Sequence, residues 1–409
     1  MKITHSNRWF PRYLLLPAAL LLSCLASAAT AGGVKFRILH NFTGGNDGGG
    51  PVLFASLAID RSGNLYGAGG GGSKKNCDGY GCGVIFEMIR QAGGKWSEDV
   101  LYNFDSLKNV DSPLAVDHQG DLYGCTGDYG PMFELTPGSP HWTFNPIWPL
   151  GCIGPVGLIT DTAGDLYGEF GNASSGGVSE LSPSPNGWVY TNLYEFCQQQ
   201  GCPDGDFPLA PFSWDSKGNL YGTTYFGGYA HDGCSNCGVA FQMTPNGDGT
   251  WTYHVMHRFS AHNDGAYPYG SLTVDASGAA YGTTTHAGPY GNGNVFKLTP
   301  AKDGQWKLSV LYGFPNANNG LAPGSNLVFD NAGNLYGTAG SPACNGGCGV
   351  IFKLSPQKNG KWNYSVLHRF SMTDGDYPNG LTMDGEGNLF GTTRGGGKYG
   401  YGVVFEITP

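Results

Sequence analysis

The side chains best suited to chemistry in this sequence are acids and aromatics that recur in one loop motif. The motif has Asp or Asn, then Gly, two further residues and Pro, and it ends at Pro51, Pro208, Pro268, Pro323 and Pro378. Its acids and aromatics, with one neighbouring Tyr, are Asp47, Asp204, Asp206, Phe207, Asp264, Tyr267, Tyr269, Asp374, Asp376 and Tyr377. Carboxylates accept hydrogen bonds from hydroxyl groups, and aromatic rings pack on apolar faces. If these side chains ring the mouth of a channel, they predict a ligand-binding surface for carbohydrate.

Two other interpretations of the motif stay open. Asp-Gly forms tight turns by itself, so the only role of these acids could be to form the turn of the loop. Carboxylate oxygens are also ligands that Ca²⁺ prefers, and the best pairs for that ion are Asp204 with Asp206 and Asp374 with Asp376. Neither pair fits the twelve-residue calcium loop, so the metal signal is weak. We expect no cofactor, with calcium as the one alternative.

Histidines offer a second kind of chemistry. His231, His262 and His286 stand on variable loops of different repeats, and acid–base catalysis would require them to converge. The sequence provides no spacing that tests this, and a solvated loop histidine is the simpler interpretation. No Gly-x-Ser-x-Gly elbow, phosphate loop or dinucleotide fingerprint occurs between a strand and a helix, so no catalytic residue is assigned.

These loops are carried by a repeated hairpin. Seven times an apolar run ends in Asp, a Gly follows three positions later, and an apolar and aromatic run comes next. The Asp residues are Asp60, Asp117, Asp161, Asp215, Asp275, Asp330 and Asp384, with a mean period of 54 residues. Asp accepts hydrogen bonds from turn N–H groups and Gly adopts positive φ, so both are predicted to shape the turn. The Tyr that follows the Gly in six repeats, and Phe390 in the seventh, are predicted to pack between repeats.

Each hairpin is followed by a variable loop, an apolar strand that ends at Pro, and a fourth strand with aromatic ends. Such a unit is too small to hold its own core, so seven copies predict an all-β fold, a seven-bladed β-propeller of four-stranded antiparallel blades. Residues 34–42 form a fourth strand with no hairpin before it, and residues 380–409 lack a fourth strand. We therefore predict that the N-terminal strand completes the last blade and closes the ring.

Residues 1–28 have the features of a secretory signal peptide. Lys2, Arg8 and Arg12 precede an apolar run, and Ala26-Ser27-Ala28 offers a cleavage site. The alternative is lipoprotein processing at Cys24. The domains expected are the signal peptide, 1–28, and one propeller, 34–409. The mature protein is expected to be secreted or at the cell surface, extracellular or periplasmic, without a transmembrane helix.

The charge balance excludes one class of partner. Without residues 1–28, 19 Lys and Arg stand against 31 Asp and Glu, a formal charge of −12, and no basic cluster is present. Polyanion binding needs a positive surface, so nucleic acid is not an expected partner. We expect a monomer whose partner is carbohydrate, another cell-surface polymer or another exported protein.

Ten cysteines remain after export, and their even number predicts disulfide bonds. Close pairs are formed by Cys77 and Cys82, Cys197 and Cys202, Cys234 and Cys237, and Cys344 and Cys348, which leaves Cys125 and Cys152. The sequence does not fix the connectivity. The Cys-x-x-Cys at 234–237 could be a redox or zinc element, but no second pair at metal spacing accompanies it, so a structural disulfide is the preferred interpretation.

The repeat resembles the GloVer tandem repeat, found in a choice-of-anchor family of exported bacterial β-propeller proteins. Residues 327–338 and 349–356 carry the resemblance most clearly, and it covers nearly all of 34–409. It implies export, often with surface display by a C-terminal sorting signal, which this sequence lacks. It implies no activity, so no catalytic residue is carried over. The third repeat, around 165–183, departs most from the pattern.

Two functions are consistent with these observations. The first is a non-catalytic binding or scaffold protein that uses the face formed by the variable loops. The alternative is a secreted glycoside hydrolase or polysaccharide lyase with its site at the mouth of the central channel. The candidate acids repeat from blade to blade, whereas catalysis would need only two or three of them, so we favour the binding protein.

Overall fold

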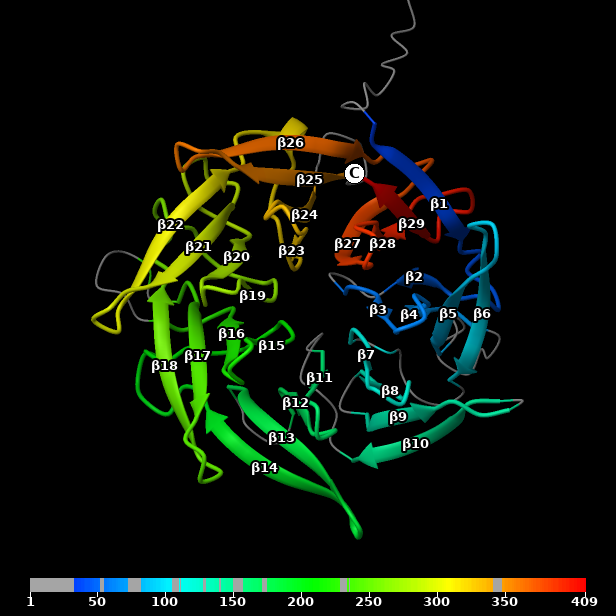
Figure 1. Ribbon diagram of the computed structural model, residues 1–409, viewed down its shortest axis with the longest axis horizontal. Coiled ribbons are helices and arrows are strands. Elements are labelled where there is room, and N and C mark those ends of the chain that lie inside the picture. The colour runs from blue at the N-terminus through cyan, green and yellow to red at the C-terminus, as the bar shows by residue number, and fades with distance from the viewer. Residues whose placement is uncertain are drawn as a thin grey trace, which may run out of the picture.

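The computed structural model describes residues 33–51, 55–72, 82–104, 110, 112–127, 130–139, 141–149, 157–170, 175–228, 234, 236–340 and 348–409. Seven antiparallel sheets are arranged around a central axis, which confirms the predicted seven-bladed propeller (Figure 1). The predicted signal peptide, Cys77, Cys152, His231 and Cys344 lie outside the described residues. Within the described ranges, no helix is long and apolar enough to cross a membrane.

The strands of each blade follow one another from the centre outward. Blade one has β2 (Gly49–Pro51), β3 (Ala58–Ile59), β4 (Leu65–Gly70), β5 (Val84–Arg90) and β6 (Trp96–Asn103). Blade two has β7 (Ala115–Val116), β8 (Leu122–Cys125), β9 (Met132–Thr136) and β10 (Thr143–Trp148). Blade three has β11 (Ile159–Thr160), β12 (Leu166–Gly168), β13 (Gly177–Ser184) and β14 (Gly187–Glu195). Blade four has β15 (Ser213–Trp214), β16 (Leu220–Thr224), β17 (Val239–Pro245) and β18 (Trp251–Arg258).

The remaining blades repeat this order. Blade five has β19 (Thr273–Val274), β20 (Ala280–Thr284), β21 (Asn294–Pro300) and β22 (Trp306–Gly313). Blade six has β23 (Val328–Phe329), β24 (Leu335–Gly340), β25 (Gly349–Pro356) and β26 (Trp362–Arg369). Blade seven has β27 (Asp376–Met383), β28 (Leu389–Gly395), β29 (Val403–Thr408) and, outermost, β1 (Lys35–Asn41). One short 3-10 helix, Ala317–Asn319, precedes blade six.

The predicted ring closure is confirmed. β1 pairs antiparallel with β29, from Lys35 opposite Thr408 to Asn41 opposite Val403. The blue and red strands lie side by side in Figure 1. Phe42, which follows β1, is 1% exposed and meets Phe86 of blade one with 5.1 Å between ring centroids. The first and last segments of the chain therefore share one sheet and one core.

The repeated Asp has the predicted role in the turn. Asp215 Oδ1 accepts hydrogen bonds from the backbone N–H of Lys217 (2.8 Å) and Asn219 (2.9 Å). The other six hairpins make the same two backbone bonds. Gly218 adopts φ 81°, a conformation that costs Gly nothing. The hydroxyl of Tyr221 also donates to Asp215 Oδ2 (3.1 Å), so the tyrosine fixes the turn as well as packing on the next blade.

The Gly after each of these tyrosines is required by close packing. A Cβ on Gly222 would lie 2.5 Å from Phe241 Cζ of the same blade, and five other blades have the same contact. Blade three lacks the phenylalanine, because Ser179 stands at that position of β13. Phe170 (3% exposed) instead lies against Gly168, so the unusual sequence of the third repeat still fills its core.

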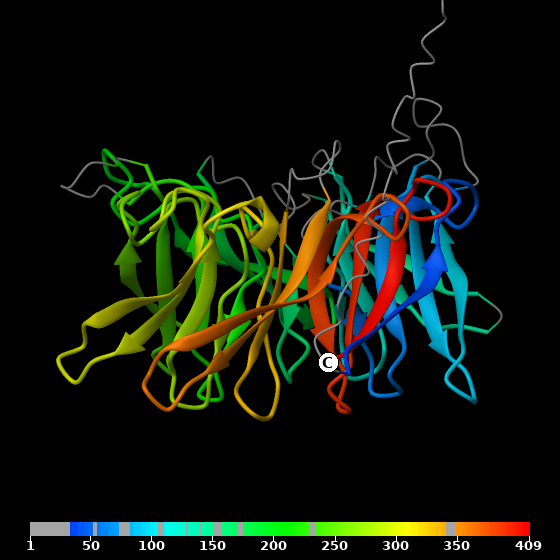
Figure 2. The same ribbon diagram turned by 90° about the horizontal axis from the view of Figure 1, so that it is seen from above.

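Disulfides fix the loops at one end of the strands. Cys197 bonds to Cys202 and Cys234 bonds to Cys237, as the sequence predicted. Cys82, Cys125 and Cys348 are disulfide-bonded too. The lead-in loops between blades and the loops after the second strands form one face of the disc, which we call the loop face. The hairpins form the opposite turn face, at the lower edge of Figure 2.

Candidate functional site

The acids of the Asp-Gly motif are held by the ends of the outer strands. The pairs are His40 with Asp47 at 3.1 Å, Tyr194 with Asp204 at 2.8 Å, His257 with Asp264 at 3.0 Å and His368 with Asp374 at 3.1 Å. The backbone also contributes, because Ser260 donates to Asp264 from its N–H (2.9 Å) and its hydroxyl (2.7 Å). Each of these carboxylates thus ties a lead-in loop to the outer strand before it.

These bonds determine the charge of the carboxylates. Burial raises the pKa of Asp264, but hydrogen bonds from His257 and Ser260 outweigh it and bring the pKa below its usual 3.8. The same balance lowers the pKa of Asp47 and of Asp374. These acids are therefore ionised at neutral pH and engaged in the loop. The geometry matches the turn-forming interpretation, and a role in ligand binding stays a prediction.

The residue before the Pro of the motif has an unusual backbone conformation. Phe207, Tyr267 and Tyr377 adopt φ of 54°, 57° and 52°. At the same position Gly50 has φ 54° and Ala322 has φ 47°. A side chain in this left-handed region costs about 1–2 kcal/mol, and such residues concentrate at functional sites. The loops therefore hold these aromatic rings in place against a local preference for Gly.

Three of the predicted aromatics are brought together on the loop face, between blades four and five. Tyr267 stacks on Tyr225 with 5.1 Å between centroids, and Tyr225 meets Tyr269 edge-on at 5.7 Å. Phe226 contacts both Phe207 (6.2 Å) and Tyr267 (6.1 Å). We call this group the aromatic cluster: Phe207, Tyr225, Phe226, Tyr267 and Tyr269. Tyr377 belongs to blade seven and lies outside it.

Other tyrosines on the loop face are exposed to solvent. In the described part of the chain the exposed fractions are 62% for Tyr290, 46% for Tyr377, 48% for Tyr399 and 51% for Tyr401. They stand at the start of β27 and on the loops that follow β20 and β28. Exposed aromatic rings on one face are typical of an interaction surface, because each ring offers apolar area and a polar hydroxyl.

The central cavity is small. It has a volume of about 30 Å³, and Ser56, Pro113, Tyr269 and Asn326 are among its lining residues. This volume suits a water molecule and is far below the several hundred Å³ of a ligand pocket. No Asp, Glu or His is found among the described residues that line it. Tyr269 is the one predicted site residue there. Four of the predicted acids, Asp47, Asp204, Asp264 and Asp374, contact the outer strands instead.

Buried acids lie beneath the loop face. Glu169 is 1% exposed and neither of its carboxylate oxygens has a hydrogen-bond partner. Burial, together with the charge of Asp206, raises the pKa of Glu169 well above 4.5. Asp206 and Asp376 each have one buried oxygen without a partner, and burial raises the pKa of both. Burial thus makes these acids harder to ionise than an ordinary carboxyl group, in contrast to Asp47, Asp264 and Asp374.

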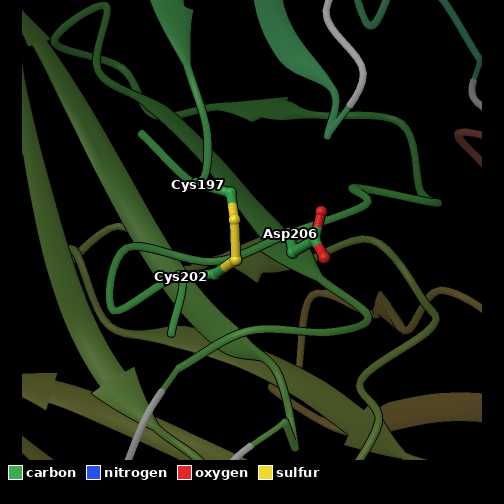
Figure 3. Close-up of side chains that lie close together, drawn as sticks. All are labelled: Cys197, Cys202 and Asp206. Atoms are coloured by element: carbon green, nitrogen blue, oxygen red, sulfur yellow. A yellow bond between two sulfur atoms is a disulfide. The ribbon is translucent and has the colours of Figure 1, made fainter. Parts of the chain in front are cut away.

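The described residues contain one group of three potential metal ligands in close proximity, and its chemistry argues against a metal. Cys197, Cys202 and Asp206 have ligand atoms within 4.8 Å of one another, but the two cysteines form a disulfide (Figure 3). A bonded sulfur is not the thiolate that binds metals. The acids of Asp204-Gly-Asp206 have different partners, since Asp204 accepts from Tyr194. Calcium binding stays a prediction for these pairs and for Asp374 with Asp376.

His262 and His286 lie on neighbouring loop segments, since the N–H of Gly288 donates to the carbonyl of His262 (2.9 Å), but no hydrogen bond or ring contact of the described residues joins their side chains. His286 meets Tyr267 edge-on at 5.5 Å and bonds to its neighbour Thr285 (2.9 Å). His262 is exposed and lies 3.3 Å from Ser260 Oγ. Their partners are all within the same blade. This arrangement agrees with solvated loop histidines.

Three residues of interest were missed by the sequence analysis. Tyr225 and Phe226 hold the aromatic cluster together, and no other repeat has two consecutive aromatics directly after its second strand. Glu169 stands where blades four and five have Thr223 and Thr283. Aligning the repeats and marking each departure would have singled out all three.

Comparison with solved structures shows the fold alone. A protein from Lactobacillus plantarum has a TM-score of 0.50 at 12% identity, over 76% of this chain and 84% of that one. A gluconolactonase from Xanthomonas campestris has a TM-score of 0.44 at 13% identity, over 94% of this chain and 92% of that one. No curated protein matches the sequence. The Gloeobacter/Verrucomicrobia repeat matches residues 126–314 and 230–409, more than half of the chain, and the chain belongs to that family.

Proposed function

We propose that this protein is an exported, non-catalytic binding protein that recognises carbohydrate or another cell-surface polymer through its loop face. The observation that carries the proposal is the gathering of tyrosine rings on that face above a central cavity of about 30 Å³. A polymer that lies across the face would meet rings from several blades. A deep pocket is not needed for that kind of contact.

The aromatic cluster and the exposed tyrosines have the chemistry for this role. A tyrosine ring packs against the apolar face of a sugar, and its hydroxyl exchanges hydrogen bonds with sugar hydroxyls. Tyr267 and Tyr377 are held by strained backbone, so little conformational entropy is lost when a ligand binds them. The acidic protein and its neutral rings favour a neutral or cationic polymer over a polyanion.

The proposal also covers the location, the processing and the oligomeric state of the protein. Disulfide bonds are typical of exported proteins and agree with an extracellular or periplasmic location. We propose that residues 1–28 are removed on export, with Cys24 as the alternative processing site. We also propose one propeller domain, 34–409, that acts as a monomer.

Retention on insoluble polysaccharides tests the binding role. Tyr267→Gly removes a ring from the cluster and keeps a residue that tolerates positive φ, as Gly50 does in blade one. A central aromatic contact contributes about 2 kcal/mol, so we expect retention to weaken roughly thirtyfold. Val189→Ala, on β14 away from the loop face, is the matched exposed control, with Val189 51% exposed. Equal retention of the Tyr267 variant and the wild type would contradict the proposal.

A second candidate function is supported by one observation, the buried acids Glu169 and Asp206. Raised pKa values suit a general acid in a secreted glycoside hydrolase or polysaccharide lyase. Glu169 is 1% exposed, however, so a substrate would reach it only after the loops move. Glu169→Gln keeps the shape of the side chain, and complete loss of oligosaccharide release in this variant would favour the enzyme.

A further inference from the structure

The seam between blades three and four has a second cavity, on the turn face. Its volume is about 560 Å³, within the range of small-molecule sites. The lining includes the hairpin acids Asp161 and Asp215 and the rings of Tyr167, Trp214 and Trp251. It therefore lies at the opposite end of the strands from the aromatic cluster, and nothing in the proposed function uses it.

Trp214 makes this seam unlike the other six. The residue before the hairpin Asp is Ile59, Val116, Thr160, Val274, Phe329 or Met383 in the other blades. The Trp214 ring meets Tyr167 edge-on at 4.8 Å and lies 6.2 Å from Trp251, tilted by 37°. Both tryptophans are half-buried, so part of each ring borders the cavity. The electron-rich face of Trp is the strongest aromatic partner for a cation.

Asp161 differs from the other hairpin acids in its second oxygen. In the other six hairpins, Oδ2 accepts a hydrogen bond from the following Tyr hydroxyl or Asn amide. In blade three Asp165 replaces the Asn, and the Tyr167 hydroxyl donates to Glu180 instead (3.1 Å). No hydrogen bond among the described residues reaches Asp161 Oδ2. An acceptor is thus free on a residue that lines the cavity.

Blade five places a lysine against the same Tyr–Asp pair, and blade six places one over the Tyr ring. In blade five Lys297 Nζ lies 4.9 Å from the centre of the Tyr281 ring and 4.0 Å from Asp275 Oδ2. In blade six Lys353 lies over Tyr336 at 5.2 Å. Blade three has Glu180 at the equivalent position of β13. No Lys or Arg occurs among the described residues that line the cavity, so its acids have no internal counter-charge from either residue type.

From these observations we infer that the turn-face cavity binds an organic cation, an alkylammonium or guanidinium group. The Trp214 and Trp251 rings contribute cation–π contact, and Asp161 Oδ2 accepts the charge-assisted hydrogen bond or faces the alkylated nitrogen. The ligand takes the role that Lys297 has in blade five. The lining also contains His118, but two acids without a Lys or Arg partner favour a cation over a neutral sugar or an anion.

Titration of the folded protein with choline chloride and with agmatine, at constant ionic strength, tests this inference. We expect saturable binding by calorimetry and by quenching of tryptophan fluorescence. Asp161→Asn keeps the turn acceptor and removes the charge, and it should weaken binding at least about tenfold. Glu180→Lys places an ammonium where Lys297 and Lys353 stand in other blades, and it should abolish binding in a protein that still folds.

Two controls show whether binding depends on the free oxygen of Asp161 and on the positive charge of the ligand. Asp330→Asn changes a hairpin acid whose Oδ2 already has partners, and its binding should equal that of the wild type. Dimethylbutanol, the neutral isostere of choline, should not bind. Absence of saturable cation binding in the millimolar range would overturn the inference. Equal binding of the neutral isostere, or full binding by the Glu180→Lys variant, would overturn it as well.

Discussion

Closure of the ring by β1 is tested by Phe42→Ala. Phe42 is 1% exposed and lies in one apolar cluster with Phe86 of blade one and Phe390 and Val404 of blade seven. Its ring meets Phe86 at 5.1 Å, with 65° between the planes. β1 is joined to β29 by hydrogen bonds and packing, not by a hairpin. Loss of this ring should therefore loosen the first strand and the seam together.

The size of the effect follows from the burial of the ring. Truncation of a fully buried Phe to Ala removes its packing and leaves a cavity, which costs about 3–5 kcal/mol. Phe259 provides a matched position at an ordinary seam. It is 0% exposed and meets Phe296 at 5.1 Å, with 61° between the planes. It follows β18, which a hairpin joins to β17, so Phe259→Ala should cost a similar energy without releasing an end of the chain.

Hydrogen exchange measured by mass spectrometry distinguishes the two variants. A ring of seven blades need not unfold in one step, so local opening energies are more informative than one global value. We expect Phe42→Ala to lower the opening free energy of residues 35–41 and 403–408 by about 3–5 kcal/mol. Phe259→Ala should leave these peptides unchanged. A loss below about 1 kcal/mol in Phe42→Ala would refute the role of β1 in closing the ring.

Three further predictions concern stability. Because the pKa of Asp264 is lowered in the folded protein, its carboxylate stabilises the fold above pH 3.8. This stabilisation is lost as the pH falls through the lower pKa of the folded state. Asp264→Asn should reduce the pH dependence of the free energy of unfolding at acid pH, measured by urea titrations at several pH values. An unchanged pH dependence would contradict this prediction. Glu169 has a raised pKa, so its penalty grows as pH rises above 4.5. Glu169→Thr should then raise the free energy of unfolding at neutral pH by about 1–3 kcal/mol, seen as a higher urea midpoint. Gly222→Ala should cost about 1–3 kcal/mol because its Cβ would meet Phe241, whereas Gly385→Ala, with nothing within 4 Å, should not shift the midpoint.

Much of the fold could be predicted because its determinants are local. Asp215 binds N–H groups two and four residues ahead of it, so the turn is encoded within five positions and repeats visibly. The phase of the repeat was enough to predict that residues 34–42 pair with the end of the chain. The sequence also indicated the packing role of the hairpin tyrosines, but not their bonds to the Asp.

The candidate site could be predicted only in part. The aromatic residues of the lead-in loops were visible, but their convergence depends on Tyr225 and Phe226 of a neighbouring loop. Asp264 looked like a channel residue, whereas its partner His257 stands at the outer strand (3.0 Å). That contact depends on how the loop doubles back, which no local pattern encodes. The free oxygen of Asp161 likewise required the bonds of all seven hairpins to be compared.

The most direct test of the proposed function follows retained protein and released sugar in one time course. The purified mature protein is incubated with insoluble polysaccharides, with and without calcium, and both quantities are recorded. The binding proposal predicts retention that saturates, that weakens in the Tyr267→Gly variant, and that yields no oligosaccharide at any time. Oligosaccharides that accumulate with time, and that disappear with Glu169→Gln, would show that the protein is an enzyme.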